Sequence, residues 1–326
     1  MSAGAAPTTR SDFRAPWWLR SGHLQTLYAP LFRRAPALEL TRERIELEDG
    51  DFVDLDWTPR SEGPLVLVLH GLEGSSDSPY ARGILRAIHA RRWRGVLMHF
   101  RGCSGEPNRL PRTYHSGDTG DLTEVVETLR ARGDIPVMAA VGYSLGGNVL
   151  LKWLGERGAG APIAAAAAVS VPYTLSRAAD RLTSGLSRIY QRRLIGELRR
   201  KLGRKFAHTA SPIDLARAQR SRDFWEFDDA VTAPLHGFRD VHDYYARASS
   251  RQYLQRIRVP TLMLHAEDDP FMTPDAVPRR EELSPSARLE LSAHGGHVGF
   301  VHGSLPWRPR YWLEERIPAF LATHLD

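Results

Sequence analysis

VMAAVGYSLGGNVLLKWLGE, residues 137–156, is the stretch that indicates the fold most directly. Its first five residues are apolar and predict a buried strand at Val137–Val141. The residues from Leu145 to Glu156 have the pattern of a helix. Between strand and helix lies a G-x-S-x-G pattern, made of Gly142, Tyr143, Ser144, Leu145 and Gly146. In this position the pattern predicts a sharp turn that presents the Ser144 hydroxyl at the C-terminal edge of a sheet.

The residue types around Ser144 suit a nucleophile. Small residues on both sides of the serine let the chain pass closely through a strained turn, because glycine has no Cβ. The helix that follows places a positive dipole end and free backbone donors where a negative oxygen would develop. We therefore expect the Leu145 amide to form half of an oxyanion hole.

The remaining sequence repeats this order of strand and helix. Such alternation is typical of the α/β class, in which helices cover both faces of a mostly parallel central sheet. Ile163–Ser170 contains five alanines, which favour helix, but its length and the following Pro172 favour a buried strand. We predict strands at residues 65–69, 95–99, 137–141, 163–170, 261–265 and 288–291, and helices at 80–90, 121–130, 145–156, 274–283 and 310–324.

Three parts are predicted along the chain. Residues 1–39 form an irregular N-terminal arm. The segment 44–57, RIELEDGDFVDLDW, alternates apolar and polar residues around Asp49 and Gly50, which predicts a hairpin that opens the sheet. From residue 173 to 255 the strand pattern stops and the sequence is basic and helical. We therefore predict a core of residues 40–172 and 256–326, with residues 173–255 inserted as a helical lid.

A serine hydroxyl is a weak nucleophile and needs a base, usually a histidine that a carboxylate holds in place. With this serine turn, the acid follows one late strand and the histidine follows the next. Asp269 follows the strand predicted at 261–265, and His297 follows the strand predicted at 288–291. We therefore predict that Ser144, Asp269 and His297 form a catalytic triad.

Neighbouring residues are alternatives for two members of this triad. Asp268 competes with Asp269, which we prefer because it precedes Pro270 in the turn that leaves the strand. His294 and His302 compete with His297, which follows two glycines that free the backbone to bring its ring to Ser144. The spacing of these histidines does not suggest a zinc site, so no metal and no cofactor are predicted.

The second oxyanion donor is expected in the segment His70–Gly74, HGLEG, which follows an early strand. This segment could turn the Leu72 amide inward, toward the oxygen that the Leu145 amide would also bind. His70 itself is expected to be a turn residue that hydrogen-bonds to the backbone; its alternative role is that of a catalytic acid.

Composition excludes several classes of protein. The chain has 326 residues, 42% of them hydrophobic and 25% charged, which suits a folded globular protein. A net charge of +6 without a basic stripe argues against a nucleic-acid partner. The longest apolar run is too short to cross a bilayer, and Met1–Thr9 does not resemble a signal peptide. With one cysteine, Cys103, the chain is expected to be cytoplasmic; its oligomeric state is left open.

Two segments allow more than one interpretation. The arginine-rich stretch Arg188–Lys205 is predicted to form the solvated face of a helix. The alternative interpretation is that this stretch makes peripheral contact with anionic lipid or an acidic partner. In the arm, Trp17, Trp18 and Tyr28 either anchor the arm or line an acyl pocket. Asp228, Asp229, His236 and Asp243 are expected to lie outside the active site, in a polar network where the lid returns to the core.

Longer blocks of sequence surround the residues discussed above: SGHLQT (21–26), HGLEGSSDSPY (70–80), FRGCSGEPN (100–108), YHSGDTGDL (114–122), GYSLGGN (142–148), FDDAVTAPLHGF (227–238), DYYARASS (243–250), EDDPFM (267–272) and GGHVGF (295–300). In these blocks the sequence resembles the YheT-like branch of the α/β-hydrolases, also described as the AB hydrolase 4 family. The resemblance covers most of residues 12–323. It implies the α/β-hydrolase fold, a predicted esterase acting on short-chain or lipid-derived esters, and a triad at Ser144, Asp269 and His297.

The sequence therefore predicts a serine hydrolase that cleaves carboxylic esters through an acyl-enzyme. An acyltransferase, or a monoacylglycerol or phospholipid lipase at a membrane surface, would use the same three residues and differ in the lid. A non-catalytic binding module is the alternative of another class, which an intact triad argues against.

Overall fold

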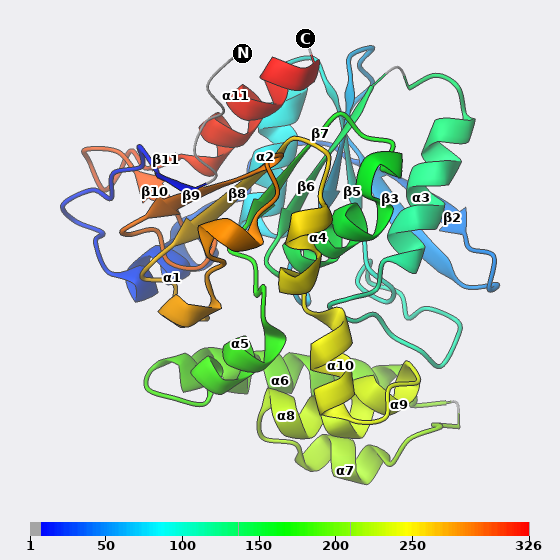
Figure 1. The fold of residues 1–326 in the computed structure, drawn as a ribbon. Helices are drawn as coiled ribbons and strands as arrows, with labels where there is room; N and C mark the ends of the chain where they lie inside the picture. Colours follow the sequence, from blue (N-terminus) through cyan, green and yellow to red (C-terminus); the bar gives the residue numbers. More distant parts are fainter. Residues whose placement is uncertain (1–7, 136, 209, 326) are drawn as a thin grey trace.

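The computed structural model describes residues 8–135, 137–208 and 210–325. A nine-stranded sheet runs through the molecule in the order β1-β9-β8-β7-β6-β4-β5-β3-β2 (Figure 1). β3 is antiparallel to both β2 and β5, and the other neighbours are parallel. The strands are β1 (Thr8–Arg10), β2 (Thr41–Glu46), β3 (Phe52–Trp57), β4 (Leu65–Leu69), β5 (Arg94–Met98), β6 (Met138–Tyr143), β7 (Ala165–Val169), β8 (Thr261–Ala266) and β9 (Ala287–Ser292).

Helices cover both faces of this sheet, which confirms the predicted fold class. α2 (Pro79–Ala90) and α11 (Leu313–Leu325) pack on one face in one apolar cluster. α3 (Gly120–Ala131) and α4 (Leu145–Arg157) pack on the other face in a second cluster. The alanine run forms the predicted strand, β7, which is fully buried between β6 and β8. Its small side chains allow α4 and α11 to approach the sheet closely.

A separate group of helices lies at one end of the sheet, at the bottom of Figure 1. These helices belong to the predicted lid and have two small apolar clusters of their own. Among the helices in the described part of the chain, none has the length and apolar character needed to span a membrane. The group contains α5 (Leu175–Leu182), α6 (Ser187–Lys205), α7 (Leu215–Arg220), α8 (Phe224–Phe227), the π-helical turn η2 (Asp228–Thr232), α9 (Ala233–Leu235) and α10 (Val241–Ala248).

The N-terminal arm is more regular than predicted. β1 pairs with β9 at the sheet edge, and α1 (Gly22–Phe32) follows it. The indole N–H of Trp18 donates to the Gly303 carbonyl, and the Tyr28 hydroxyl donates to the Pro306 carbonyl. These contacts fit the anchoring role of the arm aromatics rather than a place in an acyl pocket. The sequence prediction that Met1–Thr9 is not a signal peptide falls mostly on residues 1–7, which lie outside the described residues.

Two predicted helices differ in the structure. Residues 274–283 form two single turns, η4 (Pro274–Ala276) and η5 (Arg280–Glu282), because Pro278 between them disfavours helix at the residue before it. The last helix starts at residue 313 instead of 310, because β11 (Arg310–Tyr311) pairs with β10 (Val301–His302). Two further short 3₁₀ helices are η1 (Gly158–Gly160) and η3 (Arg251–Arg256).

Candidate active site

Ser144 stands at the turn between β6 and α4 in a strained backbone conformation. Its φ of 51° and ψ of −117° are unusual for a residue with a side chain. The turn requires glycine at positions 142 and 146, because a side chain at either position would clash with nearby backbone. A Cβ at Gly142 would lie 2.5 Å from the Gly146 carbonyl oxygen, and one at Gly146 would lie 2.4 Å from the His70 carbonyl oxygen. Tyr143 is buried beneath the turn, against the ring of Tyr80.

The structure brings the three predicted triad residues within hydrogen-bond distance of one another. The Ser144 hydroxyl oxygen lies 2.9 Å from His297 Nε2. His297 Nδ1 lies 2.9 Å from Asp269 Oδ2 and 3.2 Å from Oδ1. The Asp269 side chain is fully buried and that of His297 is 10% exposed. This geometry suits transfer of a proton from the serine to the imidazole.

Asp269 is held as a carboxylate. Its burial acts to raise the pKa, but the charge and the N–H of His297 act in the opposite direction, with help from His265 and from the Phe271 amide. The net pKa of Asp269 is therefore below its ordinary value. The Phe271 ring also stacks on the His297 imidazole, with centroids 4.0 Å apart and planes 14° from parallel. The imidazole is thus fixed by a carboxylate at its edge and by a ring on its face.

The alternative acid and bases have other partners. Asp268 accepts the Gly296 amide N–H at 2.9 Å and lies 3.2 Å from His294. His302 lies 3.3 Å from Glu315. Asp268 therefore supports the loop that carries His297, while His294 and His302 lie in other contacts.

Three consecutive amides of the His297 loop each donate to a side-chain oxygen from a different segment. Gly296 donates to Asp268 at 2.9 Å, His297 donates to the Thr26 hydroxyl at 2.8 Å, and Val298 donates to the Ser170 hydroxyl at 3.1 Å. The loop needs this support because Gly296 and Val298 both have positive φ, 59° and 60°, and Val298 is β-branched.

The segment expected to supply the second oxyanion donor lies beside Ser144. The Gly71 amide donates to the Tyr80 hydroxyl, and the Glu73 amide donates to the Tyr114 hydroxyl. Within the described residues, the Leu72 amide between them and the Leu145 amide both lack a protein acceptor. Both residues line the same cavity as Ser144. Two amides are therefore available to a ligand at the serine.

His70 has the structural role that was expected of it. One ring nitrogen lies 2.7 Å from the Gly71 carbonyl, and the other accepts the Phe100 amide N–H at 3.1 Å. Burial lowers the pKa of His70 to about 3, so the ring is neutral and donates only through Nδ1. It shapes the turn and does not reach Ser144.

A salt bridge from α6, in the predicted lid, reaches this same segment. Lys201 of α6 lies 2.9 Å from both the Glu73 carboxylate and the Cys103 sulfur. The Tyr114 hydroxyl donates to the same carboxylate at 2.7 Å. Glu73 has a positive φ of 51°, so these contacts hold a strained residue directly after Leu72. The α6 arginines are mostly exposed as predicted, whereas Lys201 and Lys205 point toward the core.

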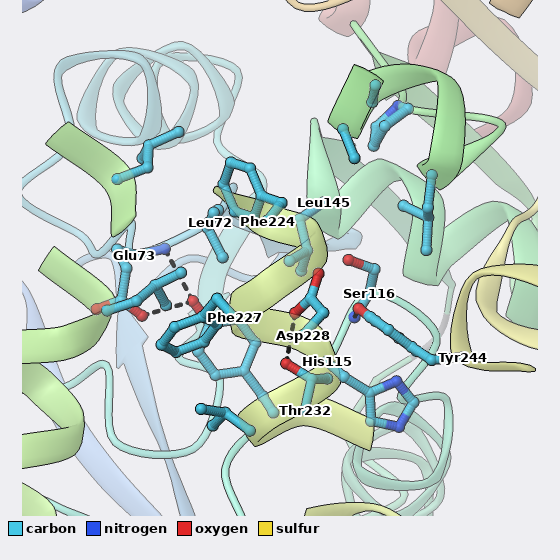
Figure 2. A pocket seen from close by; sticks show the side chains of 18 of the residues that line it. Leu72, Glu73, His115, Ser116, Leu145, Phe224, Phe227, Asp228, Thr232 and Tyr244 are labelled. Atoms are coloured by element: carbon cyan, nitrogen blue, oxygen red, sulfur yellow. Dashed lines mark hydrogen bonds between the residues drawn. The ribbon is translucent and has the colours of Figure 1, made fainter. Parts of the chain in front are cut away.

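A mostly apolar cavity of about 1040 Å³, counting the space at its mouth, is lined by Ser144 and by helices of the predicted lid. Figure 2 shows part of this lining. Asp228 lines it, contrary to the expectation that this residue lies outside the site. Its carboxylate accepts hydrogen bonds from Thr232 and Tyr245, and burial raises its pKa to about 6. The apolar lining includes Leu72, Leu145, Leu175, Leu182, Leu198 and Phe227.

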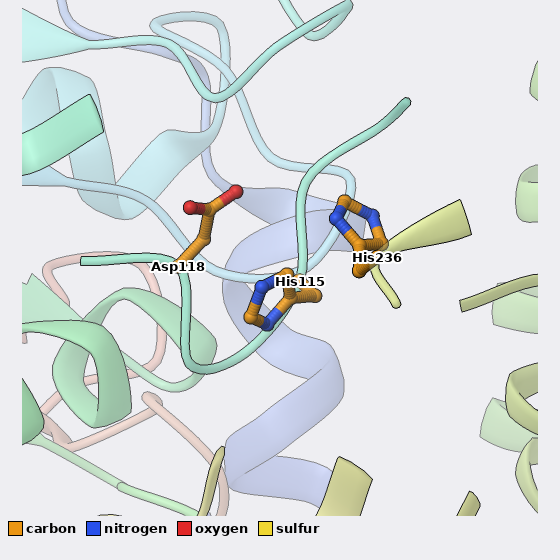
Figure 3. Close-up of side chains that lie close together, drawn as sticks. All are labelled: His115, Asp118 and His236. Carbon is orange, nitrogen blue, oxygen red and sulfur yellow. The ribbon is translucent and has the colours of Figure 1, made fainter. Parts of the chain in front are cut away.

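Three potential metal ligands lie close together (Figure 3), and one of them, His115, also lines this cavity. The ligand atoms of His115, Asp118 and His236 lie within 4.8 Å of one another. Arg112 already donates to the Asp118 carboxylate at 2.8 Å. Burial lowers the pKa of His115 to about 3 and that of His236 to about 2, and the charge of Arg112 adds to both effects. Because a cation here would meet this guanidinium, we interpret the group as a polar contact between the core and the lid.

The sequence did not indicate three residues that contact the site: Thr26, Ser170 and Phe271. A fourth, Asp228, was expected to lie outside it. Thr26 and Phe271 lie in segments quoted for the family resemblance, but neither has a residue type that marks catalysis. Thr26 is separated from His297 by 271 positions, and only the folded chain brings them together.

Comparison with known proteins gives four findings. Residues 64–304 match the family described as "alpha/beta hydrolase fold". "Putative esterase YheT" of Escherichia coli (strain K12) is 46% identical over 310 residues, covering 93% of this chain and 91% of that protein. "Phospholipase ABHD3" of Mus musculus is 30% identical over 316 residues, covering 94% and 77%. The solved structure of the Pyrococcus furiosus esterase Pf2001 has a TM-score of 0.58 at 17% identity, covering 89% and 94%; this likeness concerns the fold.

Proposed function

Because this chain belongs to the YheT-like branch of the α/β-hydrolase family, we propose that it is a serine hydrolase that cleaves carboxylic esters. The observation that carries the proposal is the unbroken line of hydrogen-bond contacts from Ser144 through His297 to buried Asp269. The esterase and phospholipase names of the relatives support the same class of reaction.

In the proposed first step, His297 Nε2 takes the hydroxyl proton while Ser144 Oγ attacks the ester carbonyl carbon. The Leu72 and Leu145 amides bind the oxygen that becomes negative. The imidazolium then returns the proton to the departing alcohol, which leaves an acyl group on Ser144. Asp269 remains ionised throughout and stabilises the imidazolium.

Water completes the cycle. His297 removes a proton from a water molecule, whose oxygen attacks the acyl carbon, and the carboxylic acid is released as Ser144 recovers its proton. If an alcohol or thiol took the place of this water, the same residues would catalyse acyl transfer. The ratio of acid to transacylated product in the presence of glycerol separates these two outcomes.

A variant of the nucleophile tests the proposal. Ser144→Ala is expected to lose fluorophosphonate labelling and turnover of p-nitrophenyl butyrate by several orders of magnitude, with its unfolding transition unchanged. Ser184→Ala, at an exposed serine of the lid, is the matched control and should behave as the parent protein. Undiminished labelling of Ser144→Ala would refute the assignment. Absence of labelling in the parent protein would instead favour a binding module.

The substrate class is proposed from the cavity. Its apolar lining, contributed in large part by α5, α6 and α8, favours an acyl chain longer than acetate. We propose that residues 173–255 act as a lid over this chain and that the substrates are lipid-derived esters. A series of p-nitrophenyl esters and monoacylglycerols of increasing length tests this; kcat/KM that is highest for acetate would refute it.

The reducing cytoplasm is the proposed location, because the single cysteine, Cys103, is free and needs no oxidising compartment.

A further inference from the structure

All the large hydrophobic side chains that are strongly exposed, within the described part of the chain, come from three segments. These side chains, which we call the apolar face, are not scattered over the protein as isolated exposed residues usually are. Trp17 and Phe32 are each 71% exposed and Trp307 is 74% exposed. The apolar face consists of Trp17, Leu24, Leu31 and Phe32 in the arm, Leu186 and Ile189 at the start of α6, and Leu305 and Trp307 between β10 and β11.

The arm contacts both of the other segments. The Trp17 indole N–H donates to the Ser304 carbonyl at 3.3 Å. At the other end of the arm, His23 Nδ1 lies 3.0 Å from the Tyr190 hydroxyl, and their rings are nearly parallel with centroids 5.8 Å apart. Figure 1 shows α1, β10 and β11 on one side of the molecule. The arm therefore links the other two segments, and the apolar face extends over all three.

This surface borders the active site. The Tyr190 ring contacts Phe271, with centroids 5.0 Å apart, and Phe271 in turn stacks on His297. In the arm, Thr26 accepts the His297 amide. Two side chains, Tyr190 and Phe271, therefore connect the apolar face with the catalytic histidine.

The charged residues of these segments are all positive. Residues 17–34, 184–193 and 303–310 contain eight arginines and no aspartate or glutamate. Three of the eight pair with carboxylates: Arg33 with Glu314, Arg193 with Glu197 and Arg310 with Glu315. Five are exposed and have no carboxylate partner among the described residues: Arg20, Arg34, Arg188, Arg192 and Arg308.

We propose that the apolar face docks on the surface of an anionic phospholipid bilayer. Tryptophan, phenylalanine and leucine side chains insert at the boundary between headgroups and acyl chains, and surrounding arginines bind the lipid phosphates. A second copy of the chain fits poorly, because a two-fold contact would place these unpaired arginines against themselves. The contact lies at the surface of the bilayer and requires no membrane-spanning helix.

The proposal is tested by co-sedimentation of the full-length chain with vesicles. Vesicles of phosphatidylcholine alone are compared with an equimolar mixture of phosphatidylcholine and phosphatidylglycerol. The protein is expected to bind the anionic vesicles, and added salt should weaken binding because it screens the arginines. Ser144→Ala should bind as the parent protein does, which separates this proposal from the proposed catalytic function.

Two double variants address the two parts of the surface. Phe32→Ser with Trp307→Ser is expected to lower the partition coefficient at least about tenfold, because two large side chains no longer insert. Arg188→Ser with Arg192→Ser should lower it about 25-fold on anionic vesicles, since each arginine near such a surface contributes about fivefold. Arg130→Ser with Arg256→Ser, on α3 and η3, makes the same change in net charge outside the three segments and serves as the matched control.

Three results would overturn the proposal. The first is failure of the parent protein to bind anionic vesicles. The second is equal binding by the face variants and the control variant. The third is a dimer in sedimentation velocity that Phe32→Ser with Trp307→Ser converts to a monomer, because the apolar face would then be an interface between copies. Unchanged thermal unfolding of each variant excludes misfolding as the cause of lost binding.

Discussion

Replacement of Thr26 by valine isolates the role of the N-terminal arm in catalysis. The Thr26 hydroxyl accepts the His297 amide at 2.8 Å and donates to the Gly22 carbonyl at 2.7 Å. Valine has nearly the same shape but offers no acceptor, so Thr26→Val leaves the His297 N–H unpaired in a partly buried place. An unpaired buried donor costs about 1 to 3 kcal/mol.

The loop can avoid this cost only by moving, and its movement displaces the imidazole. The Gly296 and Val298 amides keep their acceptors in the variant, so the change is confined to one hydrogen bond of three. If the whole cost appears in the transition state, kcat falls roughly 5- to 150-fold. KM should change little, because Thr26 does not line the cavity that holds the substrate.

The measurement is kcat and KM for p-nitrophenyl butyrate, together with urea unfolding of each variant. Thr26→Ser keeps the hydroxyl and should recover most of the lost kcat. The reasoning is refuted if Thr26→Val retains the parent kcat. It is equally refuted if Thr26→Ser loses as much activity as Thr26→Val, because the hydroxyl would then be irrelevant.

Three further predictions concern the same site. Asp269→Asn should lower kcat on the order of 10⁴-fold, because an amide does not hold the tautomer of His297 that accepts the serine proton. Asp268→Asn keeps an acceptor for the Gly296 amide and should lower kcat far less. Equal decreases in kcat would leave the acid of the triad unassigned. Lys201→Met should lower the free energy of urea unfolding by about 3 kcal/mol, because it leaves the Glu73 carboxylate buried without its cation. Addition of Glu73→Gln to this variant should restore part of the lost free energy. If it restores none, the salt bridge between Lys201 and Glu73 does not stabilise the fold. The free energy of unfolding should fall as pH decreases from about 6.5, because burial lowers the pKa of His70 to about 3 and also lowers the pKa of His265. The neutral forms of both rings stabilise the fold fully above the unfolded pKa, and below it each adds a slope of up to about 1.4 kcal/mol per pH unit. Urea titrations that show no decline between pH 6.5 and 4 would contradict this.

The sequence allowed the sheet and the positions of Ser144, Asp269 and His297 to be predicted because each depends on local pattern and chain order. A buried parallel strand is an apolar run whatever it packs against, and the carboxyl ends of such strands meet at one edge. Boundaries were less predictable where tertiary contacts decide them. β1 is only three residues long and is a strand because β9 offers it an edge. The last helix starts late because β11 pairs with β10.

The supporting residues could not be predicted for the same physical reason. Thr26 and Ser170 act through single hydroxyl groups whose partners are more than a hundred residues away along the chain. Asp228 was placed outside the site because its neighbours suggested a polar network. In the structure, Asp228 and Asp229 face different partners: Asp228 binds Thr232 and Tyr245 at the cavity, whereas Asp229 pairs with Arg217.

Asn148 shows why several family-like segments carry no chemistry of their own. It lies in the first turn of α4, four residues after Ser144, and is fully buried. Its side-chain N–H groups donate to the carbonyls of Ser116 and Ala248, and its oxygen accepts the Ser250 amide. These partners belong to the YHSGDTGDL segment and to the end of the lid. An apolar residue here would leave three buried peptide groups unpaired, at a cost of about 1 to 3 kcal/mol each. The helix that follows Ser144 therefore fixes the place where the predicted lid rejoins the core.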